Sequence, residues 1–220
     1  MPAETIRRSN FVDEAYGAIR RLILGGELRP GTQLKIDALS RQLGVSNSPI
    51  REALRRLENE RWVETIPYRG AFVRPVEAKE MIEVYEIREM LEAAALRKVM
   101  PNPTTEGLEV MERALHDIRK ALRSGKQLEY LEADTRFHAA IVHMAGNARL
   151  SAIFGALVEQ GTCFMLGRTP EAMGEYRSGE DDHGILFETI RAGETRTALR
   201  ILHRHLCVSP TAIRKLCQAS

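Results

Sequence analysis

Hydrophobic positions recur at helical spacing along most of this 220-residue chain, and this pattern predicts a mainly α-helical fold. The first such stretch covers residues 11–24, and two shorter ones follow between residues 39 and 60. Residues 62–66 and 71–73 are instead compact apolar runs joined by Pro67-Tyr68-Arg69-Gly70. That arrangement is typical of a β-hairpin.

Beyond Val73 almost no strand pattern remains and helical periodicity takes over. Short connections between successive helices indicate an all-α six-helix bundle. The change of pattern divides the chain into an N-terminal domain over residues 1–75 and a C-terminal domain over residues 76–220. We expect the bundle helices near 78–99, 104–124, 127–145, 148–166, 180–192 and 195–217, the last one kinked or interrupted at Pro210.

Residues 39–60 predict a helix-turn-helix, the arrangement that places side chains in the major groove of DNA. Leu39 and Leu43 lie on one helix face, and Gly44 suits the left-handed backbone that ends a helix. Ser48 and Pro49 are the expected N-cap and first residue of the second helix. The buried face of that helix is predicted to contain Ile50, Ala53, Leu54 and Leu57.

The exposed side of the second helix carries the side chains that we expect to contact DNA. Arg51 lies in the first turn, at the end that would enter the groove, and Arg55 projects from another side. The hydroxyls of Ser46 and Ser48, with the free N–H groups of the first turn, suit phosphate oxygens. The alternative is an ordinary amphipathic helix pair with a solvated arginine face.

The hairpin directly after this helix favours DNA binding, because the two together form a winged helix. Arg69 is then at the tip of the wing, and Gly70 allows a close backbone approach. The charge distribution agrees: residues 1–75 contain 13 Lys and Arg against 9 Asp and Glu, and the remainder contains 19 against 21. A basic N-terminal domain beside an acidic C-terminal domain is expected if only the first meets phosphates.

Four residues of the bundle combine imidazole and carboxylate groups on apolar helix faces. Asp134 and His138 are i,i+4 partners, His183 is in phase with the apolar residues after it, and His205 is in phase with Ile201 and Leu202. These groups are ligands for a first-row divalent metal, and the absence of cysteine argues against a purely structural zinc site. The alternative, for any one histidine alone, is a packed core residue.

The N-terminal motifs resemble the winged helix-turn-helix of the GntR superfamily of bacterial transcription regulators. The resemblance is carried by LGVS at 43–46, Pro49, REALRRLE at 51–58 and RGAFV at 69–73. Asn47 stands where the family usually has an arginine that reaches DNA, and Arg61 replaces a glycine. Asn47 can address adenine or a phosphate, so we expect an altered operator preference. The resemblance implies a homodimer that reads a palindromic double-stranded DNA operator.

Residues 78–210 resemble the FCD ligand-binding domain of FadR-type regulators, with a six-helix length closer to the VanR branch. The matching segments are ADTRFH at 133–138, MAGN at 144–147, DHGILFETIRAGE at 182–194 and ALRILHRHL at 198–206. In metal-binding members these motifs supply the ligands, which here fall on Asp134, His138, His183 and His205. The resemblance implies Zn, Ni or Mn as the metal and a small carboxylic or hydroxy acid as the effector.

Arg88 matches a family arginine on the first bundle helix, where it could pair with an effector carboxylate. The alternative is a surface i,i+4 pair between Arg88 and Glu92. His116, His143 and His203 match no part of the family pattern, and we expect them to be surface or packing residues.

No apolar run approaches the length of a membrane span, the N-terminus lacks an apolar signal core, and the three cysteines have no CxxC spacing. These features favour a cytoplasmic protein. The sequence therefore predicts a cytoplasmic, effector-responsive transcription regulator, more commonly a repressor in this family, and not an enzyme. Two alternatives are a metal-dependent enzyme with a DNA-binding appendage, and histidines that bind the ligand directly without metal.

Overall fold

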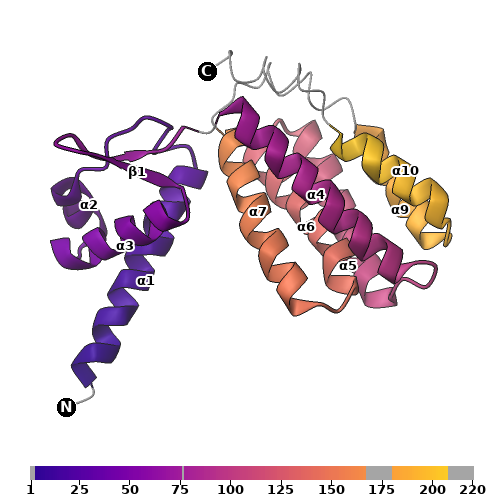
Figure 1. Cartoon of the computed structure of the whole chain (residues 1–220), viewed down its shortest axis with the longest axis horizontal. Coiled ribbons are helices and arrows are strands. Elements are labelled where there is room, and N and C mark those ends of the chain that lie inside the picture. The colour runs from indigo at the N-terminus through magenta and orange to yellow at the C-terminus, as the bar shows by residue number, and fades with distance from the viewer. Residues whose placement is uncertain (1–2, 76, 167–179, 208–220) are drawn as a thin grey trace. The chain divides into compact units, whose positions relative to one another are not determined.

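The computed structural model describes residues 3–75, 77–166 and 180–207. The chain divides into two compact units, Met1–Val76 and Glu77–Ser220. Together they confirm the predicted fold class, a winged helix-turn-helix followed by a helical bundle (Figure 1). Among the described residues, no helix is both long enough and apolar enough to cross a membrane.

The first unit contains three helices and a two-stranded antiparallel hairpin. Its elements are α1 (Ala3–Leu24), α2 (Ile36–Leu43), α3 (Asn47–Asn59), β1 (Val63–Ile66) and β2 (Gly70–Val73). Helix α3 packs against α1, α2 and β1, and it buries Ile50, Leu54 and Leu57 on the predicted face. Gly44 ends α2 in the left-handed conformation (φ 68°), as its position predicted.

Helix α3 begins earlier than we predicted. Its N-cap is Ser46 and its first residue is Asn47, so Ser48 is not the cap and Pro49 lies within the first turn. A proline is tolerated there because the first-turn N–H groups have no partner within the helix. Both serines could have served as the cap by residue type, so the local sequence did not distinguish them.

The second unit, in its described part, is a bundle of six helices. They are α4 (Ala78–Val99), α5 (Thr105–Arg123), α6 (Gln127–Met144), α7 (Ala148–Leu166), α9 (Glu180–Arg191) and α10 (Thr195–Leu206). Helix α4 packs against α6, α7 and α10, while α5 packs against α6 and α9 (Figure 1). Fully buried side chains such as Phe137, Ile141 and Leu186 form the core.

The last helix is shorter than the predicted segment 195–217. It ends at Leu206, and Cys207 is its C-cap. The predicted kink or interruption at Pro210 and the polar connection over 167–179 lie outside the described residues.

Candidate metal centre and DNA-binding surface

The start of α3 exposes the groups that the sequence predicted for DNA contact. Ser46, Asn47, Ser48, Arg51 and Arg55 are all exposed. The first turn of α3 contains no acidic residue, and the Ser46 side chain makes no capping hydrogen bond. The helix itself therefore places no carboxylate at the positive end of its dipole, which favours anion binding at this helix start.

Asn47 differs from its neighbours because its amide already has a partner. Its Nδ2 donates to Oδ1 of Asp37 on α2, over 2.9 Å. This contact links the two helices of the motif at an exposed position. While it stays bonded to Asp37, Asn47 can contact a base only through its second amide N–H or its amide oxygen. Its role in DNA reading is a prediction.

Arg56, in contrast to Arg51 and Arg55, takes part in a network that joins α3 to α1. Its guanidinium lies 2.9 Å from Asp13, 3.3 Å from Glu60 and 4.0 Å from the centre of the Tyr16 ring. The Tyr16 hydroxyl donates to Glu60 over 2.5 Å. Burial, followed by the hydrogen bond to Glu60, raises the pKa of Tyr16 to about 12. We infer that Arg56 holds α3 against α1.

The wing presents Arg69 and Gly70 at its exposed tip, as predicted. The hairpin pairs Val63 with Val73 and Ile66 with Gly70. Gly70 has a φ of 97°, in the region that favours glycine, while Tyr68 adopts a φ of 64° without being glycine. The Arg69 carbonyl accepts a 2.6 Å bond from the Gln33 amide, which fixes the tip and leaves the guanidinium over the Phe72 ring.

The bundle brings together the four predicted metal ligands from three helices. Asp134 and His138 lie on α6, His183 on α9 and His205 on α10. Oδ1 of Asp134 is 2.9 Å from Nε2 of His183, and Nε2 of His138 is 3.1 Å from Nε2 of His205. One ligand atom from each residue lies within 4.8 Å of all the others.

These separations fit a transition-metal site with little adjustment. Ligand bonds of about 2.0–2.1 Å place adjacent atoms of an octahedron about 2.9 Å apart and opposite atoms about 4.1 Å apart. The separations of 2.9 and 3.1 Å match adjacent positions. The limit of 4.8 Å exceeds the distance between opposite positions by less than about 1 Å, so the side chains would move together by no more than that to bind an ion. Phe137 touches the rings of His138 and His183 edge-on, with centroids 5.5 and 5.0 Å apart, and restricts their orientation.

The electrostatics of the group favour the ligand forms of Asp134 and His205. Burial opposes ionisation of Asp134, but the imidazoles of His138 and His183 outweigh it and lower the pKa of the carboxyl group. Burial, together with the neighbouring His183 and His138, lowers the pKa of His205 well below its ordinary value. An ionised carboxylate and a neutral imidazole are the forms that bind a metal.

Glu92 is a site residue that the sequence analysis did not identify as one. Its carboxylate has no solvent exposure, lies 2.6 Å from Nδ1 of His138 and accepts a 3.1 Å bond from Nε of Arg88. The Arg88–Glu92 pair therefore forms, but it is buried, with side chains 7% and 0% exposed, and not the surface pair of the alternative. Burial opposes the shift, yet His138 and Arg88 lower the pKa of Glu92.

This chain of contacts orients His138 toward the group. A hydrogen bond from Nδ1–H to Glu92 leaves Nε2 as the lone-pair nitrogen that faces Asp134 and His205. Arg88 also lies over the rings of Tyr85 and Phe154, 5.1 and 6.0 Å from their centres. On the second histidine, Nδ1 of His183 is buried without a hydrogen-bond partner among the described residues.

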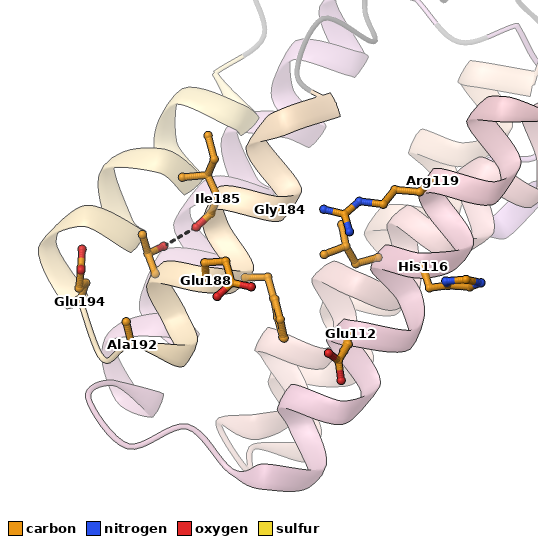
Figure 2. A pocket seen from close by; sticks show the side chains of 11 residues that line it. Glu112, His116, Arg119, Gly184, Ile185, Glu188, Ala192 and Glu194 are labelled. Carbon is orange, nitrogen blue, oxygen red and sulfur yellow. Dashed lines mark hydrogen bonds between the residues drawn. The ribbon is translucent and has the colours of Figure 1, made fainter.

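The other histidines lie elsewhere. His116, His143 and His203 are exposed, as expected for residues outside the family pattern. His116 lines an open pocket of about 710 Å³ between α5 and α9. Figure 2 shows Arg119 and Glu112 on one wall of this pocket and Gly184, Ile185 and Glu188 on the other. None of the predicted metal or effector residues lines it.

Comparisons with known proteins agree on the family of both units. Residues 11–73 match the model of "Bacterial regulatory proteins, gntR family", and residues 83–207 match the FCD domain. The chain is 31% identical over 136 residues to an uncharacterized HTH-type transcriptional regulator of Bacillus subtilis, covering 61% of each chain. It is 34% identical to the Nta operon transcriptional regulator of Aminobacter aminovorans, covering 56% of this chain and 58% of the relative.

A longer match covers almost the whole chain. The gluconate operon transcriptional repressor of Bacillus licheniformis is 25% identical over 93% of this chain and 85% of its own length. Among solved structures, a GntR transcriptional regulator from Rhodococcus sp. RHA1 has a TM-score of 0.77 at 22% identity, covering 92% of this chain and 96% of that one. E. coli McbR/YncC has a TM-score of 0.71 at 22% identity, covering 89% and 93%.

The family assignment decides between the function classes that the sequence left open. The match covers the DNA-binding unit and the bundle separately, and the relatives are named as transcription regulators. The alternative of a metal-dependent enzyme with a DNA-binding appendage is therefore not supported. The chain belongs to the GntR family of bacterial transcription regulators, with an FCD domain as its C-terminal unit.

Proposed function

We propose that this protein is a homodimeric repressor whose bundle binds a divalent metal and a small organic acid, and whose winged helix reads half of a palindromic operator. The observation that carries the proposal is the convergence of Asp134, His138, His183 and His205 within 4.8 Å. Repression is supported by relatives that are named as repressors, among them the gluconate operon repressor.

The four ligands would hold a Zn, Ni or Mn ion with up to two positions left for a carboxylate or hydroxyl group of the effector. The metal would act as a Lewis acid that binds the effector's oxygen atoms. Arg88 is the candidate for a second contact with the acid. Its Nε is bonded to Glu92 and would therefore take no part in that contact.

The DNA-binding role is assigned to Ser46, Asn47, Ser48, Arg51, Arg55, Arg69 and Gly70, all exposed. A helix start without first-turn acids would approach phosphates, Arg51 and Arg55 would reach the major groove, and the wing tip would contact the adjacent backbone. Two copies related by a twofold axis would then match a palindrome.

The proposal is tested first by metal content and affinity. Full-length protein, stripped with a chelator and dialysed, is titrated calorimetrically with Zn²⁺, Ni²⁺ and Mn²⁺. His183→Gln should lose high-affinity binding by more than the roughly 10–100-fold expected for an outer-shell change. His143→Gln, at an exposed position on α6, is the matched control and should bind like wild type. Equal metal affinities for wild type, His183→Gln and His143→Gln would contradict the proposed metal site.

The effector is tested by thermal shift with a set of small mono- and dicarboxylic acids, with and without metal. An acid that stabilises only the metal-loaded protein supports the proposal, because a ligand of the folded state raises its stability by linkage. Stabilisation of the stripped protein alone would instead support direct binding by the histidines. The active acid should also release the protein from DNA fragments selected for binding in vitro.

A further inference from the structure

A histidine, a cysteine and a glutamate come together on the outside of the bundle, where the end of α10 meets α4. His203 and Cys207 are one helical turn apart at the end of α10, and Glu89 lies on α4. Sγ of Cys207 is 3.3 Å from Nδ1 of His203, and Oε1 of Glu89 is 3.4 Å from the same nitrogen. The His203 side chain is 64% exposed and that of Glu89 28%.

These separations resemble the edges of a zinc coordination tetrahedron. Bonds of about 2.3 Å to sulfur and about 2.0–2.1 Å to nitrogen and oxygen give a sulfur–nitrogen edge of about 3.5 Å and a nitrogen–oxygen edge of about 3.3 Å. The observed contacts lie within about 0.2 Å of these values. Both partners approach the same nitrogen, so an ion would need them to turn until all three side chains flank it. Such rotations are open to the exposed side chains of His203 and Cys207 and leave the backbone in place.

The donor set differs in kind from that of the buried group. It contains a cysteine, whose thiolate is a soft ligand, and its carboxylate and thiolate would together balance the charge of a divalent ion. Burial and the neighbouring Glu89 raise the pKa of the Cys207 thiol, so a metal that binds there must displace its proton. His203 is two residues from His205 and points to the opposite side of α10, so the two groups share no ligand.

We propose that Glu89, His203 and Cys207 form a second, thiolate-containing site for a divalent metal of the zinc type, with water as the fourth ligand. A metal there would fasten the end of α10, which carries His205, to α4, which carries Glu92. This inference is independent of the proposed function of the buried group, because it rests on other side chains and another surface.

The test uses Co²⁺ as a probe in the full-length protein. A thiolate bound to Co²⁺ gives a near-ultraviolet charge-transfer band, which a site made only of histidine and aspartate cannot produce. We expect this band in wild type, with the same intensity in Cys163→Ser and Cys217→Ser, the matched controls at the other cysteines of the chain. Cys207→Ser should abolish the band, and His203→Gln should weaken Co²⁺ binding at least tenfold. Added Zn²⁺ should displace Co²⁺ and remove the charge-transfer band of wild type.

The His183→Gln variant distinguishes the second site from the buried group. In that variant the band should persist and appear with the first equivalent of Co²⁺, because the competing site is lost. Absence of the band in wild type, or its survival in Cys207→Ser, would overturn the second site and leave the buried group untouched. If wild type gave the Co²⁺ band but no calorimetric signal from the buried group, the proposed function would be contradicted and this inference would stand.

Discussion

Glu92 shows how one side chain sets the chemistry of its neighbours. It is fully buried between Arg88 and His138, and both contacts favour its ionised form. A buried carboxylate is costly unless it is paired, so its place in the core is compensated only while both partners remain. Because the ionised group accepts the Nδ1–H bond, it also fixes the tautomer of His138 and raises the basicity of Nε2.

Glu92→Gln is therefore expected to weaken metal binding by about 10–100-fold, the usual effect of changing an outer-shell partner of a ligand histidine. Calorimetric titration of the stripped protein with Zn²⁺ measures the change. Glu86→Gln, on the exposed side of the same helix, is the matched control. Unfolding by urea, followed in both variants, separates a loss of affinity from a loss of fold. An affinity equal to that of Glu86→Gln would show that Glu92 has no influence on the metal.

We expect the arginines of α3 to divide between DNA recognition and structure. Arg51 faces solvent at the helix start, whereas Arg56 contacts Asp13, Glu60 and Tyr16. We expect Arg51→Ala to reduce specific DNA binding by about 10–100-fold, which corresponds to about 1–3 kcal/mol for one lost base contact, without lowering thermal stability. Arg56→Ala should show the reverse, a lower melting temperature with a smaller loss of affinity. Titrations at fixed salt with selected DNA fragments decide between them, and equal effects on affinity would contradict the division.

The contact between α1 and α3 should also be sensitive to alkaline pH through Tyr16. Its pKa is about 12 in the folded protein and about 10 in an unfolded chain. The folded state therefore holds the proton more tightly, and this stability is complete below pH 10 and is lost as the pH rises through about 12. Tyr16→Phe should remove this part of the pH dependence, whereas Tyr68→Phe, at a fully exposed tyrosine, should keep it. Urea unfolding at pH 9, 10 and 11 measures the difference.

The helices were predictable from the sequence where the pattern was local. The candidate metal centre was predictable only in part. Periodicity and glycine ends located the helices, and the apolar phase of His183 and His205 placed both side chains inward. The role of Glu92 was not visible, because an i,i+4 pair with arginine is usually solvated and its third partner, His138, is 46 residues away. The start of α3 was misplaced by two residues because two serines offered equivalent caps.

At the scale of the molecule, the two compact units have separate cores, and one residue distinguishes them optically. Trp62 is the chain's single tryptophan, and it is 5% exposed in the first unit. Its fluorescence therefore reports on the winged helix alone, while far-ultraviolet circular dichroism reports mainly on the helices of both units.

This arrangement predicts that metal binding stabilises the units unequally. A ligand of the folded bundle at 100 times its dissociation constant adds about 2.7 kcal/mol to the stability of the unit that binds it. Zn²⁺ should therefore raise the melting temperature followed by circular dichroism and leave the Trp62 transition in place, and a chelator should reverse the shift. His183→Gln should remove the part of the shift that comes from the buried group. If the Trp62 transition moved by the same amount, the units would unfold as one, and the metal would already be coupled to the DNA-binding unit without an effector. A shift of the Trp62 transition alone would place the metal in the wrong unit.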